Sequence, residues 1–186
     1  MNAPIDVSSV ILHTPRLTLR PWQMSDVEDL YTYAKVDGVG QMAGWTPHKN
    51  REESRTILQL FLDGKNQFAL EYQGKVIGSV GIEKYDEALL PEYADRKGRE
   101  IGYVLSKDYW GQGLMPEAVQ AVIEYLFQQV GLDFLVCCHY LENDQSRRVQ
   151  EKCGFHHLKQ ARFSTRYGVE KEGWLSLLER DEASTI

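Results

Sequence analysis

The stretch YWGQGLMPEA, residues 109–118, places two glycines one residue apart, directly before a predicted helix. That helix is indicated by one apolar stripe at helical spacing, formed by Met115, Ala118, Val119, Val122 and Leu126. The first turn of a helix has N–H groups without partners and carries partial positive charge. Glycines let a bulky anion approach such a backbone closely. We therefore predict that the turn at residues 111–115 binds a phosphate or pyrophosphate group, with a plain tight turn as the alternative.

Two familiar nucleotide motifs do not match this turn. A P-loop requires Gly-Lys followed by Ser or Thr at the helix start, whereas this chain reads Gly113-Leu114-Met115. A dinucleotide-binding turn has a third glycine, where this chain has Pro116, and it begins directly after its strand. Here the preceding strand-like segment ends near Leu105, several residues earlier. A nucleotide-binding regulator is therefore disfavoured.

The rest of the chain alternates strand and helix patterns, without an internal repeat or a low-complexity linker. Ser25 is the expected N-cap of the first helix. The segment 133–140 is almost continuously apolar, as expected for a strand covered on both faces. Strands are predicted at 16–20, 67–72, 75–85, 99–105, 133–140, 155–158 and 173–180, and helices at 26–34, 51–62, 114–130 and 143–154. This order predicts a single α/β domain with a mixed sheet.

Composition limits the classes of function. The chain has 186 residues, a formal net charge of -6 and 42% hydrophobic residues. An acidic chain lacks the basic face that nucleic-acid binding needs. We see neither a signal peptide nor a membrane span of about 18 apolar residues, so we expect a cytoplasmic protein. Cys137, Cys138 and Cys153 lack metal-binding or disulfide spacing, so they are expected to be reduced core thiols, and no metal site is predicted.

Three segments, in this order and spacing, resemble the GNAT superfamily of acetyl-CoA-dependent N-acetyltransferases: EIGYVL at 100–105, YWGQGLMPEA at 109–118 and NDQSRRVQEKCGF at 143–155. The opening RLTLRPWQMSD and the Trp of YWGQG resemble the branch that acetylates N-terminal alanine or serine of ribosomal proteins. The resemblance covers about residues 14–180 and implies one domain over residues 1–186. It implies a mixed, mostly antiparallel α/β (α+β) sheet of about seven strands, with a splayed V-shaped cofactor cleft and about four flanking helices.

The resemblance implies acetyl-CoA as the cofactor. The family's pyrophosphate turn, R/Q-x-x-G-x-G/A, is occupied here by Trp110, Gly111, Gln112, Gly113, Leu114 and Met115. Trp110 stands where the family has Arg or Gln, and Met115 stands where it has a small residue. Because backbone N–H groups hold the pyrophosphate in this family, neither change is expected to abolish binding.

The same resemblance assigns contacts with the pantetheine arm of the cofactor. Tyr103, Val104 and Leu105 are implied to bind the arm through their backbone groups. An N–H near Val104 would polarise the thioester carbonyl, as a fixed donor does in an oxyanion hole. Asn143 is implied as a further contact with the arm, with a role as a helix N-cap as the alternative.

The resemblance implies direct attack by an amine in a ternary complex, without a cysteine intermediate. Ser146 shares one helix face with Val149 and Cys153, so its hydroxyl points inward, either as a core hydroxyl or as the donor to the departing thiolate. Attack requires a neutral amine, and a carboxylate is the natural base. Glu100 is the first candidate base and Glu83 the second, with ordinary exposed carboxylates as the alternative for both.

We therefore expect transfer of an acetyl group from acetyl-CoA to a primary amine, and the branch favours a protein N-terminal amine. A polyamine, an aminoglycoside or an amino acid is the alternative acceptor, and a non-catalytic acyl-CoA sensor is the alternative class. The loop at 35–50 and residues 159–172 are expected to shape the acceptor pocket. The chain is expected to act as a monomer or homodimer, with neither nucleic acid nor membrane as a partner.

Overall fold

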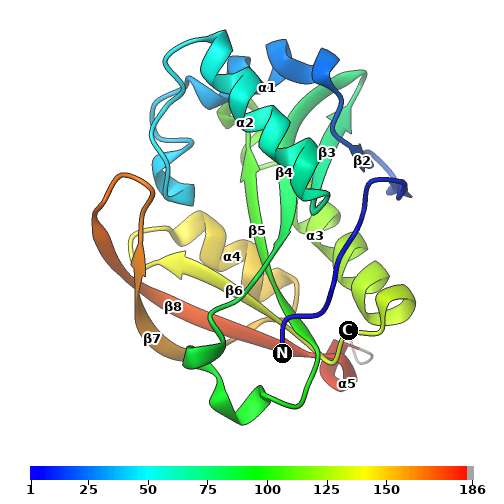
Figure 1. Ribbon diagram of the computed structural model, residues 1–186, viewed down its shortest axis with the longest axis vertical. Coiled ribbons are helices and arrows are strands. Elements are labelled where there is room, and N and C mark those ends of the chain that lie inside the picture. Colours follow the sequence, from blue (N-terminus) through cyan, green and yellow to red (C-terminus); the bar gives the residue numbers. More distant parts are fainter. Residues whose placement is uncertain (184–186) are drawn as a thin grey trace.

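Eight strands and five helices follow one another in the computed structural model, which describes residues 1–183 (Figure 1). The strands are β1 (Leu12–His13), β2 (Thr18–Pro21), β3 (Gln67–Tyr72), β4 (Lys75–Glu83), β5 (Gly98–Leu105), β6 (Phe134–Tyr140), β7 (His156–Ser164) and β8 (Glu170–Glu179). The helices are α1 (Val27–Ala34), α2 (Arg51–Gly64), α3 (Leu114–Tyr125), α4 (Asp144–Lys152) and α5 (Arg180–Ala183). The predicted succession of strands and helices is confirmed.

Two short elements account for the difference between the observed numbers of strands and helices and the predicted numbers, about seven and about four. The strand β1 has two residues and the helix α5 has four, so neither is long enough to show a periodic pattern in the sequence. The predicted cap of α1 is wrong. A turn of 3-10 helix, Met24–Asp26, precedes α1 and contains Ser25, and the Asp26 carboxylate accepts the N–H of Gln23 at 2.8 Å. Asp26 is the N-cap residue of α1, but its carboxylate makes no cap hydrogen bond to that helix, because it forms a two-fold ion pair with Arg20 of β2, at 2.9 Å.

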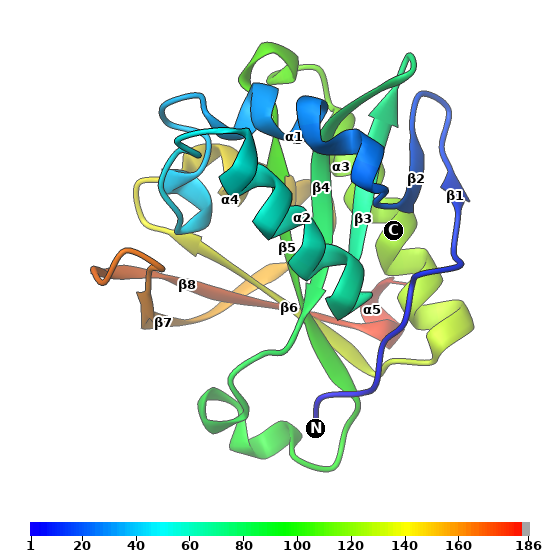
Figure 2. The same cartoon turned by 45° about the horizontal axis from the view of Figure 1, so that its top comes forward.

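All eight strands form one sheet, in the order β1-β2-β3-β4-β5-β6-β8-β7. Neighbouring strands are antiparallel except β5 and β6, which are parallel. Their pairing covers only Gly98 to Glu100 against Phe134 to Val136, although β5 continues to Leu105. Beyond this point the strands separate, and Figure 2 shows β6, β8 and β7 crossing the direction of β3, β4 and β5. The predicted splayed, mostly antiparallel sheet is confirmed.

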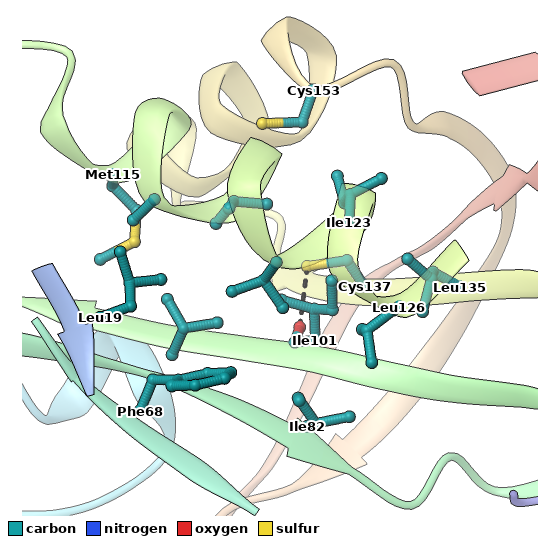
Figure 3. Close-up of a cluster of buried hydrophobic side chains, with 14 of the residues drawn as sticks. Leu19, Phe68, Ile82, Ile101, Met115, Ile123, Leu126, Leu135, Cys137 and Cys153 are labelled. Atoms are coloured by element: carbon teal, nitrogen blue, oxygen red, sulfur yellow. Dashed lines mark hydrogen bonds between the residues drawn. The ribbon is translucent and has the colours of Figure 1, made fainter. Parts of the chain in front are cut away.

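Side chains near the point where β5 and β6 separate explain why these two strands pair and then diverge. A Cβ atom on Gly98 would lie 2.2 Å from the ring of Phe134, so glycine permits the close approach at the start of β5. Farther along, the thiol of Cys137 donates a hydrogen bond to the carbonyl of Ile101 at 3.1 Å (Figure 3). A side chain of β6 thus occupies the place that a backbone N–H would take in a continued ladder.

Helices cover both faces of the sheet. The predicted apolar stripe of α3 is buried and packs with Leu19, Phe68 and Ile101 on one face (Figure 3). On the opposite face, α1 and α2 pack against β3 and β4 in a second cluster that contains Tyr33 and Leu58. A third cluster joins β6 and β8 to the connection between β4 and β5, and contains Tyr85, Leu90, Phe134, Val136, Leu175 and Leu177. The strand β6 is therefore covered on both faces, as predicted.

Gly98→Ala is expected to lower the free energy of unfolding by about 1–3 kcal/mol, because the new methyl group collides with the Phe134 ring. Gly102→Ala is the matched control on the same strand, since a Cβ there meets nothing within 4 Å. We expect the control to change stability by less than about 0.5 kcal/mol. Urea denaturation of both variants measures these changes. Equal losses of stability in the two variants would contradict the role of Gly98 in the close approach of β5 and β6.

Candidate active site

A cavity of about 770 Å³ lies where β5 and β6 separate. Its wall includes the end of β5, the first turn of α3, one face of α4 and parts of two loops. The lining residues around the start of α3 and on α4 include Gly111, Gly113, Leu114, Met115, Pro116, Arg148, Val149 and Lys152. Those around the β4–β5 connection, β5, β6 and β7 include Tyr85, Asp86, Leu89, Leu90, Glu100, Cys138, Arg162, Phe163 and Ser164. The size falls within the range of ordinary small-molecule sites, about 300–1,000 Å³.

The glycine turn requires glycine at both positions. Gly111 and Gly113 have φ values of +76° and +75°, in the left-handed region that side chains disfavour. Gly113 is the N-cap residue of α3, and the first turn of that helix borders the cavity. The tight turn and the helix start are therefore present at residues 111–115, and the binding of an anion there stays a prediction. The side chain of Gln112 is directed to the carbonyl of Asp108, and Gln112 does not line the cavity.

Basic side chains flank the glycine turn, and the sequence reasoning did not select them. Arg16 donates to the carbonyl of Gln112 at 2.9 Å and to the carboxylate of Glu117 at 2.7 Å. Arg148 and Lys152 line the cavity from α4, four residues apart on one helix face. That spacing was visible in the sequence, but only the fold shows that this face borders the turn. Together they supply positive charge beside a site for phosphate groups.

The backbone of β5 has one free side along the cavity. The carbonyl of Val104 faces β4, since a Cβ on Gly78 would lie 2.4 Å from it. The carbonyl of Ile101 faces β6, so Tyr103 and Leu105, which alternate with Val104, also face the cavity side. Trp110 Nε1 donates to the carbonyl of Leu105 at 2.9 Å. The donor predicted near Val104 therefore corresponds to the N–H of Tyr103 or Leu105.

Asn143 has two structural tasks at the cavity. Its Oδ1 accepts the N–H of Ser146 at 3.1 Å, so its predicted role as the N-cap of α4 is confirmed. Its Nδ2 donates to the carbonyl of Met42 at 3.3 Å, in the loop predicted to shape the acceptor pocket. The backbone N–H of Arg166 donates to the carbonyl of Gly44 in the same loop at 2.8 Å. The loop 35–50 and the β7–β8 connection thus meet, and the cavity wall includes Val39, Met42 and Ala43 of the loop and Arg162, Phe163 and Ser164 at the end of β7.

Ser146 lies on the cavity wall and is buried, as its predicted inward orientation requires. Its Oγ is 2.8 Å from the hydroxyl of Tyr103 and 3.3 Å from Nε2 of Gln150. The sequence reasoning assigned Tyr103 to the cofactor through its backbone alone, whereas its phenol also contacts Ser146. Burial raises the pKa of Tyr103 well above its ordinary value, so the phenol keeps its proton.

Only one of the two candidate bases lines the cavity. Glu100 alternates with the core residue Ile101, so its carboxyl points to the opposite face, where it lies beside Cys138 and lines the cavity. Burial raises the pKa of Glu100 to about 7; a hydrogen bond with Cys138 opposes this shift, and the charge of Glu83 adds to it. Glu83 itself is outside the cavity wall, where its carboxylate accepts from Asn66 at 3.0 Å and from Gln67.

The cysteines are poorly suited to nucleophilic catalysis. Burial raises the pKa of Cys153 to about 12 and raises those of Cys137 and Cys138 as well. Cys137 packs in the core with α3, while Cys138 faces the third cluster, as adjacent strand residues should. No set of three or more potential metal-ligating side chains gathers anywhere in residues 1–183. Over the same residues, no helix has the length and apolar character needed to cross a membrane.

The geometry fits an extended ligand that carries amide groups and a pyrophosphate. The free edge of β5 would bind the amides of a pantetheine arm, and the first turn of α3 would bind the pyrophosphate. Arg148 and Lys152 would face the phosphate groups. These residues match the chemistry of acetyl-CoA.

Comparison with known proteins agrees with this geometry. The family model described as an acetyltransferase (GNAT) domain matches residues 16–156. The uncharacterized N-acetyltransferase p20 of Bacillus licheniformis is 30% identical in an alignment of 152 positions that covers 77% of this chain and 81% of that protein.

Two solved structures share the fold. The ribosomal-protein-S5-alanine acetyltransferase from Vibrio fischeri has a TM-score of 0.70 and 20% identity, over 94% of this chain and 98% of that one. The microcin C7 self-immunity acetyltransferase MccE, solved with acetyl-CoA and AMP, has a TM-score of 0.75 and 20% identity, over 89% of this chain and 93% of that one. The protein belongs to the GNAT family and is an acetyl-CoA-dependent N-acetyltransferase.

Proposed function

We propose that this enzyme acetylates the α-amine of a protein or peptide N-terminus. The observation that carries this proposal is Glu100, a partly buried carboxyl group on the cavity wall with a pKa of about 7. An α-ammonium group has a pKa near 8, about one unit above that of Glu100, whereas a lysine-like amine has a pKa near 10.4. Proton transfer to Glu100 is therefore far less costly from an α-amine. The similar structure from Vibrio fischeri, a ribosomal-protein-S5-alanine acetyltransferase, supports the same acceptor class.

In this mechanism, acetyl-CoA supplies an acetyl group already activated as a thioester. Glu100 removes the proton of the acceptor ammonium group, directly or through one water molecule. The backbone N–H of Tyr103 or Leu105 stabilises negative charge on the carbonyl oxygen during direct attack in a ternary complex. Ser146 donates a hydrogen bond to the sulfur as it departs. A strong acid is unnecessary there, because a thiol with a cysteine-like pKa near 8.5 is a good leaving group.

The three cysteines are unpaired and none is fully exposed. Free, buried thiols are typical of reducing compartments, and we propose that the enzyme works in the cytoplasm.

The first experiment is acetyl-CoA-dependent thiol release against a panel of amines. The panel holds peptides with varied first residues, polyamines, aminoglycosides and free amino acids. We expect turnover with peptides, in preference to lysine-like amines. Turnover restricted to one of the small-molecule classes would overturn the acceptor assignment, and tight acetyl-CoA binding without any turnover would favour an acyl-CoA sensor.

Gly111→Glu is expected to abolish acetyl-CoA binding, because it adds bulk and like charge where the pyrophosphate would lie. Gly74→Glu is the matched control. Gly74 has a similar φ of +77° and equally open surroundings, but it lies in the β3–β4 turn outside the cavity. Isothermal titration calorimetry should show a loss of at least 100-fold for the first variant and wild-type affinity for the control. Unchanged affinity in folded Gly111→Glu would remove the cofactor from this turn.

If Glu100 is the base, the direction in which kcat/KM changes with pH is defined. As a base it must be ionised, so kcat/KM should rise as pH passes about 7, and a second rise near pH 8 should come from the acceptor α-amine. Glu100→Gln should lower kcat/KM by about 100-fold and remove the first rise but not the second. Glu83→Gln should keep activity and move the first midpoint to lower pH, because it removes a charge that raises the Glu100 pKa.

The same carboxyl should reduce stability at high pH. The folded-state pKa of Glu100 lies above its unfolded value, so its stabilising contribution is complete below about pH 4.5 and is lost as pH rises through about 7. Glu100→Gln should therefore raise the melting temperature relative to wild type more at pH 8 than at pH 5. An inactive variant without this gain would mean that Glu100 is ordinarily hydrated.

Ser146→Ala is expected to lower kcat by about tenfold while leaving the affinity for acetyl-CoA within about twofold, because the hydrogen bond matters most as charge develops on sulfur. Steady-state kinetics and a separate binding titration give the two quantities. An unaltered kcat would make Ser146 a core hydroxyl.

A further inference from the structure

A buried amide lies directly behind Ser146. The side chain of Gln150 is 1% exposed and does not line the cavity. Its Oε1 is 2.9 Å from Nδ1 of His139 and 2.8 Å from Oγ of Ser176. Its Nε2 is 3.2 Å from the carbonyl of Cys138 and 3.3 Å from Oγ of Ser146. The amide thus has two contacts at each end, which is its full capacity for hydrogen bonds.

The carbonyl of Cys138 fixes the orientation of this amide. A carbonyl oxygen can only accept, so the Gln150 atom that faces it must be the nitrogen. A reversed amide would place two acceptor oxygens together in a buried site, at a large cost. Nε2 therefore donates one hydrogen to Cys138, and its second hydrogen points to Ser146 Oγ. On the other side, His139 must carry its proton on Nδ1 in order to donate to Oε1.

These directions determine what Ser146 can do. Its oxygen accepts from Nε2 of Gln150 at 3.3 Å. The phenol of Tyr103 is 2.8 Å from the same oxygen, but its single hydrogen is directed to the backbone carbonyl of Ser146 at 3.1 Å, which can only accept. With Gln150 as the donor to its oxygen, the Ser146 hydroxyl keeps its own hydrogen for donation, either to the phenol oxygen or to a ligand atom in the cavity.

We propose that Gln150 is a positioning residue that fixes the Ser146 hydroxyl as a hydrogen-bond donor toward the departing sulfur of the cofactor. This inference rests on the proposed role of Ser146. Gln150 does not itself reach the cavity, so it acts through Ser146.

The test measures the pKa of the CoA thiol in the enzyme–CoA complex, from the ultraviolet absorbance of the thiolate. The protein thiols should not interfere, because burial raises their pKa values. A hydrogen bond from Ser146 should lower the pKa of the bound thiol below that of free CoA. Gln150→Met keeps the side-chain length and should raise this pKa by about one unit relative to wild type, with a fall in kcat of about tenfold and little change in CoA affinity.

Ser176→Ala is the matched control, since it removes a hydrogen bond to Oε1 of the same amide and leaves Nε2 in place. It should reduce stability without moving the bound-thiol pKa. In a Ser146→Ala background, Gln150→Met should cause no further change, because the residue through which Gln150 acts is absent. If Gln150→Met does not fold, Gln150→Asn keeps an amide and withdraws it from Ser146 by one methylene.

The outcomes separate this inference from the proposed function. An unchanged bound-thiol pKa in folded Gln150→Met or Gln150→Asn overturns the inference, as does an effect that persists at full size without Ser146. A Ser146→Ala variant with wild-type kcat and thiol pKa overturns the role of Ser146 and this inference with it, although acetyl transfer to peptides would stand. A lowered thiol pKa that depends on Gln150, together with no turnover on any amine, supports the inference and rejects the proposed reaction.

Discussion

The site depends on the short parallel pairing of β5 with β6. The ladder ends at Glu100 and Val136, while β5 continues to Leu105 along β4. The strand therefore keeps its antiparallel partner on one side and presents unpaired backbone on the other. Such a row of groups is normally a liability, because it invites pairing with another chain. Here it faces a cavity between two walls of the same domain, where a ligand with amide groups can complete the ladder.

Because successive side chains of β5 point to opposite faces of the sheet, its polar side chains are divided between the two faces. Glu100 points to the face on which Cys138 lies, whereas Tyr103 points to the face covered by α3 and α4, where Ser146 lies. A base for the attacking amine and a donor for the departing sulfur must act on different sides of the reacting carbonyl group. One strand can place side chains on both of these sides only if their positions in the sequence are separated by an odd number, as positions 100 and 103 are.

Features with a local cause were predictable from the sequence. The stripe of α3, the glycine turn and the Asn143 cap each depend on residues within a few positions of one another. Features that depend on other segments were not predictable in this way. Asp26, not Ser25, is the N-cap residue of α1, and Arg20 on β2 holds its carboxylate. Of the two candidate bases, only Glu100 lines the cavity, since Asn66 and Gln67 bind the carboxylate of Glu83 outside it. No sequence pattern indicated that Gln150 would stand behind Ser146.

Two polar side chains, one on the cavity wall and one behind it, have surroundings that differ in a way that matches their chemistry. The Gln150 amide is neutral and has partners for all four of its hydrogen-bonding positions, so its burial is well compensated and its geometry is fixed. The Glu100 carboxyl shares its surroundings with the thiol of Cys138 and the like charge of Glu83, which cannot replace the water that a carboxylate loses. Its neutral form is favoured for that reason, and its affinity for a proton rises toward that of an α-amine. A side chain with all its hydrogen bonds made is well suited to orienting a neighbouring group. A carboxylate that has lost part of its hydration is well suited to removing a proton. The fold places the first beneath α4 and the second at the end of the β5–β6 ladder.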